Sequence, residues 1–214
     1  MLFDLHVHTD ISPCSRLAVA DILRNATYRG LDGVCITDHQ TMSIRHKIRE
    51  GRQPDGLMVI FGMEYTTCEG DFLIFGPFEN IPGDLSARAL LKTVAAAGGA
   101  AVAAHPFRAN RPVSDWLIQE GLCRTVEAVN GRNSPDENRQ VARWRNAYPL
   151  SETGGSDAHT LEELGTVVTR FDRPIHSGDD LISALKNGHC QPWQGYRPPL
   201  ANALPAVSES DALL

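Results

Sequence analysis

The feature that most constrains the fold is an alternation of short apolar runs with amphipathic stretches along most of the chain. Short apolar runs between turn residues are typical of buried strands, and apolar positions three and four apart are typical of helices. We expect strands at the start of the chain and over residues 33–37, 57–64, 72–75, 100–104, 125–129, 150–153 and 165–170, and helices over residues 17–29, 42–50, 86–97, 114–120, 134–148 and 179–187. Strands that alternate with helices predict a parallel sheet, and about seven such units favour a closed or nearly closed barrel over an open doubly wound sheet.

Polar side chains stand where these apolar runs end, and in a parallel barrel the carboxyl ends of the strands share one rim. The residues in these positions are His6, His8, Asp38, His39, Glu64, His105, Asn130, Asp157 and His159. His6 and His8 are two apart in a strand, so they share a face, with Leu5 and Val7 on the other. Two such histidines are by themselves also compatible with an ordinary surface. The whole set of imidazoles and carboxylates at one rim predicts a metal site.

The composition excludes several classes of protein. With 214 residues, 42% of them hydrophobic, the chain is long enough for one domain with a full core. Apolar runs of about 18 residues are missing, so we expect no spanning helix, and Met1 leads almost directly into the first strand, which leaves no room for a signal peptide. The net charge of −6 argues against a surface for duplex nucleic acid or anionic membrane. The five scattered cysteines form no CxxC pair, which fits a reducing cytoplasm.

With these residues laid out, the chain resembles the PHP (polymerase and histidinol phosphatase) family. The resemblance covers residues 1 to about 190 and rests on five segments: residues 4–9 (DLHVHT), 37–39 (TDH), 62–64 (GME), 104–106 (AHP) and 155–159 (GSDAH). It implies a distorted (β/α)7 TIM-like barrel with its metal site at the C-terminal ends of the strands. We therefore expect a PHP domain over residues 1–192, and a tail over residues 193–214 that is irregular or packs against a partner subunit.

The resemblance also implies a set of metal ligands. A first ion would be held by His6, His8, Glu64 and Asp157. Glu64 would bridge to a second ion, held also by His105, and His39 and His159 would hold a third. Imidazole and carboxylate ligands together suit Mn, Zn or Fe, whereas carboxylate and water alone would suit Mg or Ca. The resemblance thus predicts two or three divalent ions of the first kind.

Two positions depart from the family pattern. Many members place a histidine after the bridging glutamate, and the counterpart here is Asp71, which is either a ligand of the second ion or a turn residue. Members also tend to place an aspartate or histidine after the first motif, where this chain has Cys14. Cys14 is a possible thiolate ligand that would favour Zn or Fe, or a small loop residue that leaves the third site weak.

The resemblance implies phosphoester hydrolysis, with a metal-bridging hydroxide as the nucleophile and the metals neutralising the charge that develops. Arg108 and Arg132 follow strand ends, and each is either a ligand for a phosphate dianion or a solvated charge. Asp38 either orients a metal ligand or has a plain structural role, and Asn130 contacts substrate or fixes a ligand. His159 or His39 would serve as general acid if not fully committed to metal.

The leading hypothesis is a metal-dependent phosphoesterase for a small phosphorylated metabolite, nucleotide or short oligonucleotide. A PHP-type phosphotyrosine phosphatase is a narrower variant of it. An amidohydrolase-type metal enzyme is less consistent with the sequence, because none of the three lysines, Lys47, Lys92 and Lys186, ends a strand. The third alternative is a metal-binding or regulatory domain without catalysis, which the departures at Cys14 and Asp71 keep open.

Overall fold

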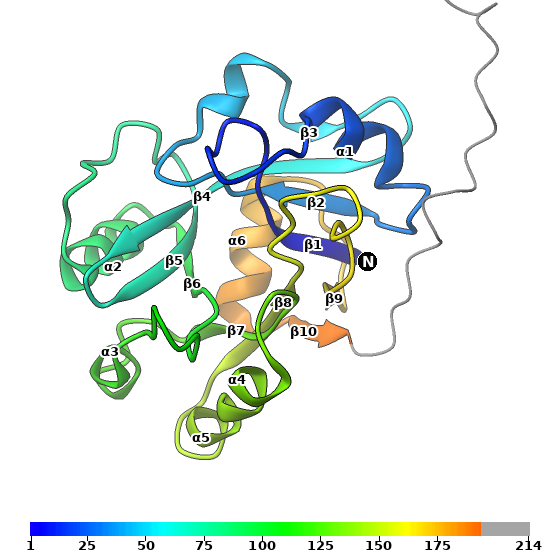
Figure 1. Ribbon diagram of the computed structural model, residues 1–214. Coiled ribbons are helices and arrows are strands. Elements are labelled where there is room, and N and C mark those ends of the chain that lie inside the picture. Colours follow the sequence, from blue (N-terminus) through cyan, green and yellow to red (C-terminus); the bar gives the residue numbers. More distant parts are fainter. Residues whose placement is uncertain (194–214) are drawn as a thin grey trace, which may run out of the picture.

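The computed structural model describes residues 1–193, and these fold into one ten-stranded sheet with helices packed around it (Figure 1). The strands are β1 (Leu2–Val7), β2 (Gly33–Ile36), β3 (Gly51–Arg52), β4 (Met58–Thr67), β5 (Gly70–Phe75), β6 (Ala100–Ala103), β7 (Thr125–Asn130), β8 (Ser151–Gly155), β9 (Val168–Phe171) and β10 (Cys190–Trp193). The helices are α1 (Val19–Asn25), the 3₁₀ turn η1 (Ser43–His46), α2 (Ala87–Ala96), α3 (Asp115–Gln119), α4 (Pro135–Gln140), α5 (Ala142–Arg145) and α6 (Gly178–Asn187).

The sheet is mixed, whereas the alternation of strands and helices predicted a parallel one. Its order is β10-β9-β1-β2-β4-β5-β6-β7-β8, with β3 added on β4. The pairs β1–β2, β2–β4, β6–β7 and β7–β8 are parallel, but β4–β5, β5–β6, β1–β9 and β9–β10 are antiparallel. The β4–β5 turn is too short for the crossover that a parallel pair requires, since Thr67 already pairs with Gly70.

The two ends of the sheet approach each other and nearly close the expected barrel. The Thr169 hydroxyl on β9 donates to the carbonyl of Gly154 on β8 at 2.7 Å and accepts from its backbone N–H at 2.8 Å. A further bridge joins Val7 at the end of β1 to Ala158 in the loop after β8. At this seam between β8 and β9, the Thr169 side chain takes the place of backbone-to-backbone hydrogen bonds. The end of β1 and the loop after β8 lie side by side.

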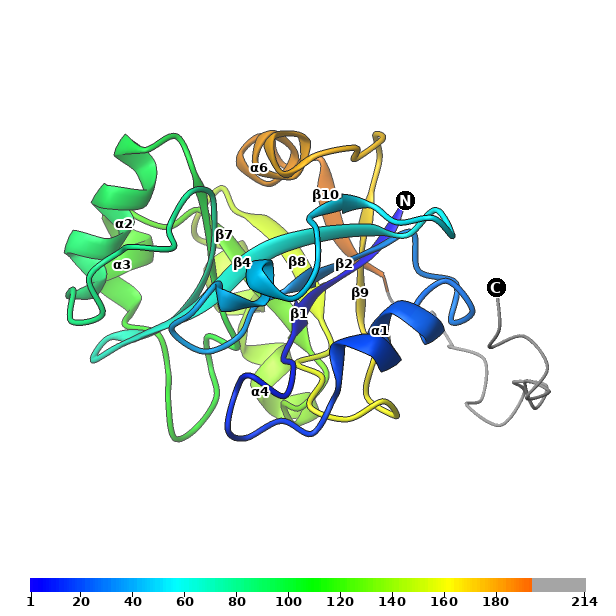
Figure 2. The same cartoon turned by 90° about the horizontal axis from the view of Figure 1, so that it is seen from above.

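Buried side chains form two clusters on the two faces of the sheet. One gathers residues of α1, α2, α3 and α5, including Ile22 and Trp144, and the other packs strand residues such as Phe3 against Leu185 and its neighbours on α6. Figure 2 shows α6 on one side of the strands and α1 and α4 on the other. Leu5 and Val7, expected on one face, belong to different clusters because the register of β1 shifts between Asp4 and Val7.

Several element boundaries differ from the sequence expectation. The helix predicted over residues 134–148 divides at Val141, whose N–H bonds the carbonyl of Asn138 as in a 3₁₀ turn. The helix expected over 42–50 contracts to η1, and β10 was not expected. Ser134 forms the capping box of α4 with Glu137, in keeping with the helix start predicted there. Trp193, assigned to the tail, ends β10, and residues 194–214 lie outside the described part of the chain.

Within residues 1–193, none of the helices combines the length and the apolar character that a membrane crossing requires.

Candidate metal centre

The predicted ligands come together at one rim of the barrel. They are His6 in β1, His8 just after it, His39 after β2, Glu64 within β4, His105 after β6, and Asp157 and His159 after β8. All seven side chains are buried except that of His39, which is 32% exposed. Glu64 lies well inside its strand, because β4 continues beyond the barrel rim into its hairpin with β5.

His6 lies at the centre of this cluster. Its Nε2 atom is 3.1 Å from Nε2 of His8, 3.3 Å from Oε2 of Glu64 and 3.5 Å from Oδ1 of Asp157. The other ring nitrogen, Nδ1, is 3.0 Å from a carboxylate oxygen of Glu127. Because a carboxylate only accepts hydrogen bonds, this contact places a proton on Nδ1, and Nε2 is the nitrogen that faces the other ligands.

His105 completes the deep part of the cluster. Its Nε2 atom is 2.8 Å from Oε1 of Glu64, and its Nδ1 atom is buried with no hydrogen-bond partner within the described residues. Its backbone has a positive φ of 30°, and that of Asp157 has a φ of 56°. Such values are uncommon for residues other than glycine, and they concentrate at binding sites.

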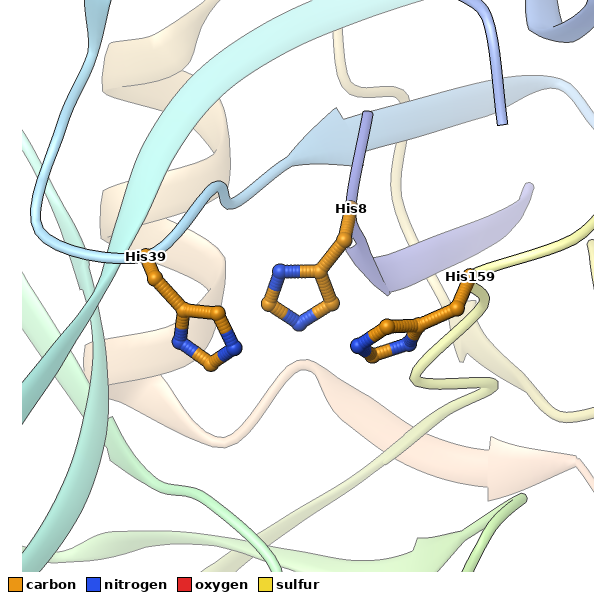
Figure 3. A group of neighbouring side chains, drawn as sticks. All are labelled: His8, His39 and His159. Atoms are coloured by element: carbon orange, nitrogen blue, oxygen red, sulfur yellow. The ribbon is translucent and has the colours of Figure 1, made fainter. Parts of the chain in front are cut away.

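A second group of ligands lies nearer the surface and consists of three histidines (Figure 3). The ring of His8 is 4.4 Å from the ring of His39 and 4.5 Å from that of His159, measured between centroids. Nδ1 of His39 is also 3.0 Å from Oε2 of Glu64. His8 therefore belongs to both parts of the centre.

Three groups of side chains have ligand atoms that all lie within 4.8 Å of one another. They are His6, Glu64 and His105; His6, His8 and Asp157; and His8, His39 and His159. We call the first two the inner groups and the third the outer group. Converging lone pairs of this kind repel one another unless a cation or protons lie between them, and the donor set of nitrogen and carboxylate oxygen suits Zn, Mn or Fe. The residues present therefore fit the divalent ions that the sequence predicted.

The charges of the inner groups depend on one another. Burial lowers the pKa of His6, but the charges of Asp157, Glu127 and Glu64 outweigh it and leave that pKa well above 6.5. The pKa of His8 is raised too, because its hydrogen bonds to Asp157 and Glu64 outweigh its burial. Burial raises the pKa of Glu64, but the charge of His6 and the hydrogen bond from His105 leave it well below 4.5. Without metal, protons supply the positive charge that the buried carboxylates require.

The outer group behaves in the opposite way. Burial lowers the pKa of His39 in spite of the nearby carboxylate of Glu64. Burial and the charge of His8 lower the pKa of His159. These two imidazoles are therefore neutral at pH 7, which is the form that binds metal.

Asp38 does not face the ligands directly. It accepts hydrogen bonds from the backbone N–H of Thr9 at 2.7 Å, from the Thr9 hydroxyl at 2.7 Å and from the Ser12 hydroxyl at 2.6 Å. Ser12 in turn accepts from the backbone N–H of His39 at 3.1 Å and lies 3.5 Å from Nδ1 of His8. Asp38 thus acts through Ser12 on the position of two outer ligands.

The two arginines named from the sequence have different surroundings. Arg108 donates to Oδ2 of Asp157 at 2.7 Å, to Asn130 at 2.9 Å and to Asn133 at 3.0 Å. Arg132 is more exposed, with Nη1 2.9 Å from Nδ1 of His159. Arg108 is held by its partners beside a ligand, whereas Arg132, whose Nε atom is 3.6 Å from a carboxylate oxygen of Glu163, is the more exposed of the two guanidinium groups.

The two positions that depart from the family pattern lie outside the three ligand groups of residues 1–193. Asp71 is 3.9 Å from Nε2 of His105, but it forms an ion pair with Arg111 at 3.0 Å. Cys14 is an exposed residue. Partial desolvation of its sulfur, together with the charges of Glu64 and Asp157, raises the pKa of its thiol. A raised thiol pKa disfavours the thiolate that a metal would need.

Sequence reasoning missed Glu127. This fully buried residue of β7 contacts His6 through Oε1, and through Oε2 it accepts from the backbone N–H of His105 at 2.7 Å and from Nδ2 of Asn130 at 2.9 Å. A carboxylate inside an apolar strand, residues 125–129, is a signal that the sequence does contain, because a charge in that position needs buried partners.

Comparisons with known proteins agree with this geometry. The model of the PHP domain matches residues 4–143, and a model described as PHP-associated matches residues 135–190. The protein MJ1587 of Methanocaldococcus jannaschii is 32% identical over 117 residues, which are 50% of this chain and 68% of that protein.

Solved structures extend the likeness to the fold. The lesion-specific endonuclease PfuEndoQ of Pyrococcus furiosus superposes with a TM-score of 0.68 at 16% identity, covering 90% of this chain and 58% of that one. A two-domain protein of Bacteroides vulgatus, described as containing a predicted PHP-like metal-dependent phosphoesterase, has a TM-score of 0.66 at 18% identity, covering 90% and 64%. The PHP domain match alone spans well over half of the sequence. The chain therefore belongs to the PHP domain family.

Proposed function

We propose that this protein is a metal-dependent phosphoesterase that acts on a small phosphorylated metabolite, a nucleotide or a short oligonucleotide. The observation that carries the proposal is the set of three ligand groups that share His6 and His8, which gives room for adjacent cations at one rim. Adjacent cations are characteristic of enzymes that hydrolyse phosphate esters. A phosphoesterase and an endonuclease among the structural neighbours, both named for phosphoester chemistry, support the same reaction class.

The inner groups would hold two ions, and the outer group would hold a third. Bound there, divalent ions supply Lewis acidity, which activates water near neutral pH and offsets the charge that develops on a phosphoryl group. We propose Mn, Zn or Fe for these positions, because the ligands combine imidazole with carboxylate.

The chain's own residues would orient the substrate. Arg132 stands at the mouth beside His159, and a guanidinium binds a phosphate through two parallel hydrogen bonds. Arg108 would mainly hold Asp157 in place, because its Nε atom donates to Asn133 and its Nη2 atom to Asn130 and Asp157. Asn130 would position Arg108 and Glu127 and would not bind phosphate itself.

The surroundings of the site favour a small substrate. Arg111, the partner of Asp71, also lines a neighbouring cavity of about 360 Å³ together with Thr67, Cys68, Gly70, Asn110, Pro112 and Ser114. A cavity of that volume suits one metabolite or nucleotide, since pockets for small molecules span about 300–1,000 Å³. We propose that the part of the substrate that does not react lies here.

The proposal is tested by assaying purified protein, stripped of metal and reloaded with Mn, Zn or Fe, on p-nitrophenyl phosphate, bis(p-nitrophenyl) phosphate and an anilide. We expect metal-dependent release of nitrophenol from the monoester, loss of this activity in His8→Ala, and normal activity in the control His46→Ala, which alters an exposed histidine outside the three ligand groups. Preference for the diester would favour a nuclease-like activity. Protein that binds metal but cleaves none of the three substrates would contradict the proposal and favour a metal-binding domain without catalysis.

A further inference from the structure

Glu127 contacts both histidines that carry the group His6, Glu64 and His105. Its Oε1 atom accepts from Nδ1–H of His6 at 3.0 Å, and its Oε2 atom accepts from the backbone N–H of His105 at 2.7 Å. The carboxylate is buried, so neither contact is replaced by bulk water. Nothing else among the described contacts of His6 Nδ1 would hold its proton on that nitrogen.

We propose that Glu127 is the positioning residue of the inner metal groups, and that it acts by fixing the tautomer of His6. With the proton held on Nδ1, the Nε2 lone pair of His6 faces Glu64, Asp157 and His8, where a metal would be bound. A carboxylate behind a metal-binding imidazole also makes that imidazole a better electron donor. The proposal concerns metal binding at the site on which the proposed function depends, but it does not depend on the reaction.

The second contact of Glu127 fixes the backbone of His105. The φ of His105 is 30°, a conformation that costs free energy unless its surroundings hold it. The 2.7 Å hydrogen bond from its N–H to Glu127 is a contact that holds it. One carboxylate therefore positions two ligands that come from different strands, β1 and β6.

A glycine on the neighbouring strand leaves the space that the Glu127 carboxylate occupies. A Cβ atom on Gly155 of β8 would lie 2.5 Å from Oε1 of Glu127 and 2.6 Å from Cβ of His6. Both distances are far inside van der Waals contact, so only glycine allows the carboxylate and the imidazole to meet here. The contact between His6 of β1 and Glu127 of β7 therefore also depends on Gly155 of β8.

The substitution Glu127→Gln is expected to change the tautomer of His6 while the other hydrogen bonds of residue 127 are kept. Three donors reach the two carboxylate oxygens, and two of them, from His105 and Asn130, reach Oε2. The glutamine oxygen is expected to take the Oε2 position, which keeps both of these bonds and turns the amide NH₂ toward His6. Nδ1 of His6 must then accept, so the proton moves to Nε2 and blocks the inner metal position.

The test compares zinc affinity, by competition with a chelating dye, in wild type, Glu127→Gln and the control Glu120→Gln, whose carboxylate is exposed and paired with Arg88. We expect Glu127→Gln to remain folded in chelator, because Nε2–H of His6 can donate to Glu64, and to lose about 10- to 100-fold in its tightest zinc affinity. Glu120→Gln should bind zinc like wild type. Wild-type zinc affinity in Glu127→Gln would overturn the proposal, since a merely structural role is preserved by glutamine.

The ¹⁵N chemical shifts of the His6 ring give a second readout, which needs only the wild-type protein loaded with zinc. We expect a protonated Nδ1 and a metal-bound Nε2, and a His6 that binds zinc through Nδ1 would overturn the proposal even if Glu127→Gln did not fold. Phosphate release is not measured in either experiment. Absence of phosphoesterase activity would therefore contradict the proposed function but not this inference. Normal zinc binding in Glu127→Gln would contradict this inference but not the proposed function.

Discussion

The inner and outer ligand groups share His8 but are built in different ways. The inner groups combine His6, fully buried, with the carboxylates of Glu64 and Asp157, and the imidazoles of His6 and His8 carry raised pKa values. The outer group has only imidazoles, and those of His39 and His159 have lowered pKa values. The inner groups therefore require positive charge, whereas His39 and His159, which belong to the outer group alone, are stable as neutral imidazoles.

This difference assigns different tasks to the two parts. Removal of a cation from buried carboxylates leaves charges unpaired, which is costly, so the inner ions should exchange slowly. The outer group is partly open to solvent at His39 and lies beside Arg132 and His159. If the proposed function holds, the outer group would bind an ion that arrives or leaves with substrate.

The largest effect is expected from His6→Ala, which removes the one ligand common to both inner groups and leaves Glu64 and Asp157 without it. Because even a residue that only supports a ligand is worth about 10- to 100-fold, activity should fall by more than about 100-fold. Metal analysis should show loss of inner ions. Undiminished phosphate release from this variant would contradict the view that the inner groups hold the ions on which activity depends.

A smaller effect is expected from His39→Ala, which removes a ligand of the outer group alone. The protein should keep its inner ions through dialysis and lose about 10-fold in activity, the low end for loss of a supporting group. Equal metal loss in His39→Ala and His6→Ala would show that the groups are not separate. His46→Ala again serves as the exposed control.

The variant Arg132→Ala tests whether the arginine beside the outer group contributes to phosphate binding. Its side chain is 45% exposed, so its contribution to phosphate binding is screened and should be about 1 kcal/mol, or about fivefold in KM. The value of kcat should change little, because the contact exists before and during the reaction. Arg49→Ala is the matched control, because Arg49 is exposed and has no described side-chain contact with the ligands. A large fall in kcat for Arg132→Ala would mean that Arg132 acts in the transition state.

The smallest effect is a dependence of stability on pH in chelated protein. His6 and His8 have folded pKa values above the ordinary 6.5, so their protonation stabilises the fold below that pH, and this contribution is lost as pH rises through the folded values. We expect Tm in EDTA to fall by a few degrees above pH 6.5, since 1 kcal/mol is worth about 2–4 °C at this size.

With saturating Zn or Mn the trend should reverse, because metal replaces the protons more easily as pH rises. Thermal melts at matched ionic strength test both halves of this expectation. A chelated protein whose Tm rises between pH 6.5 and 8.5 would contradict the protonation of His6 and His8 in the folded state.

The barrel and the set of ligands could be predicted because each is indicated by short stretches of sequence: the alternation of strands and helices, and the polar residues where the apolar runs end. A strand that ends in His6 and His8, or in His105, can be recognised without knowing its neighbours. The contacts of Glu127, and the seam formed by Thr169 and Gly154, join residues far apart in the chain, so no local pattern announces them. The antiparallel β4–β5 hairpin was missed because apolar runs do not encode strand direction.

Anomalous X-ray scattering at the zinc edge tests the two-part centre most directly. Crystals of chelated protein would be soaked first with less than one equivalent of zinc and then with an excess. The account predicts that the first peak appears among His6, Glu64, Asp157 and His105, and that a peak between His8, His39 and His159 follows only in excess zinc. A first peak at the outer histidines, with the inner groups still free of zinc, would contradict it.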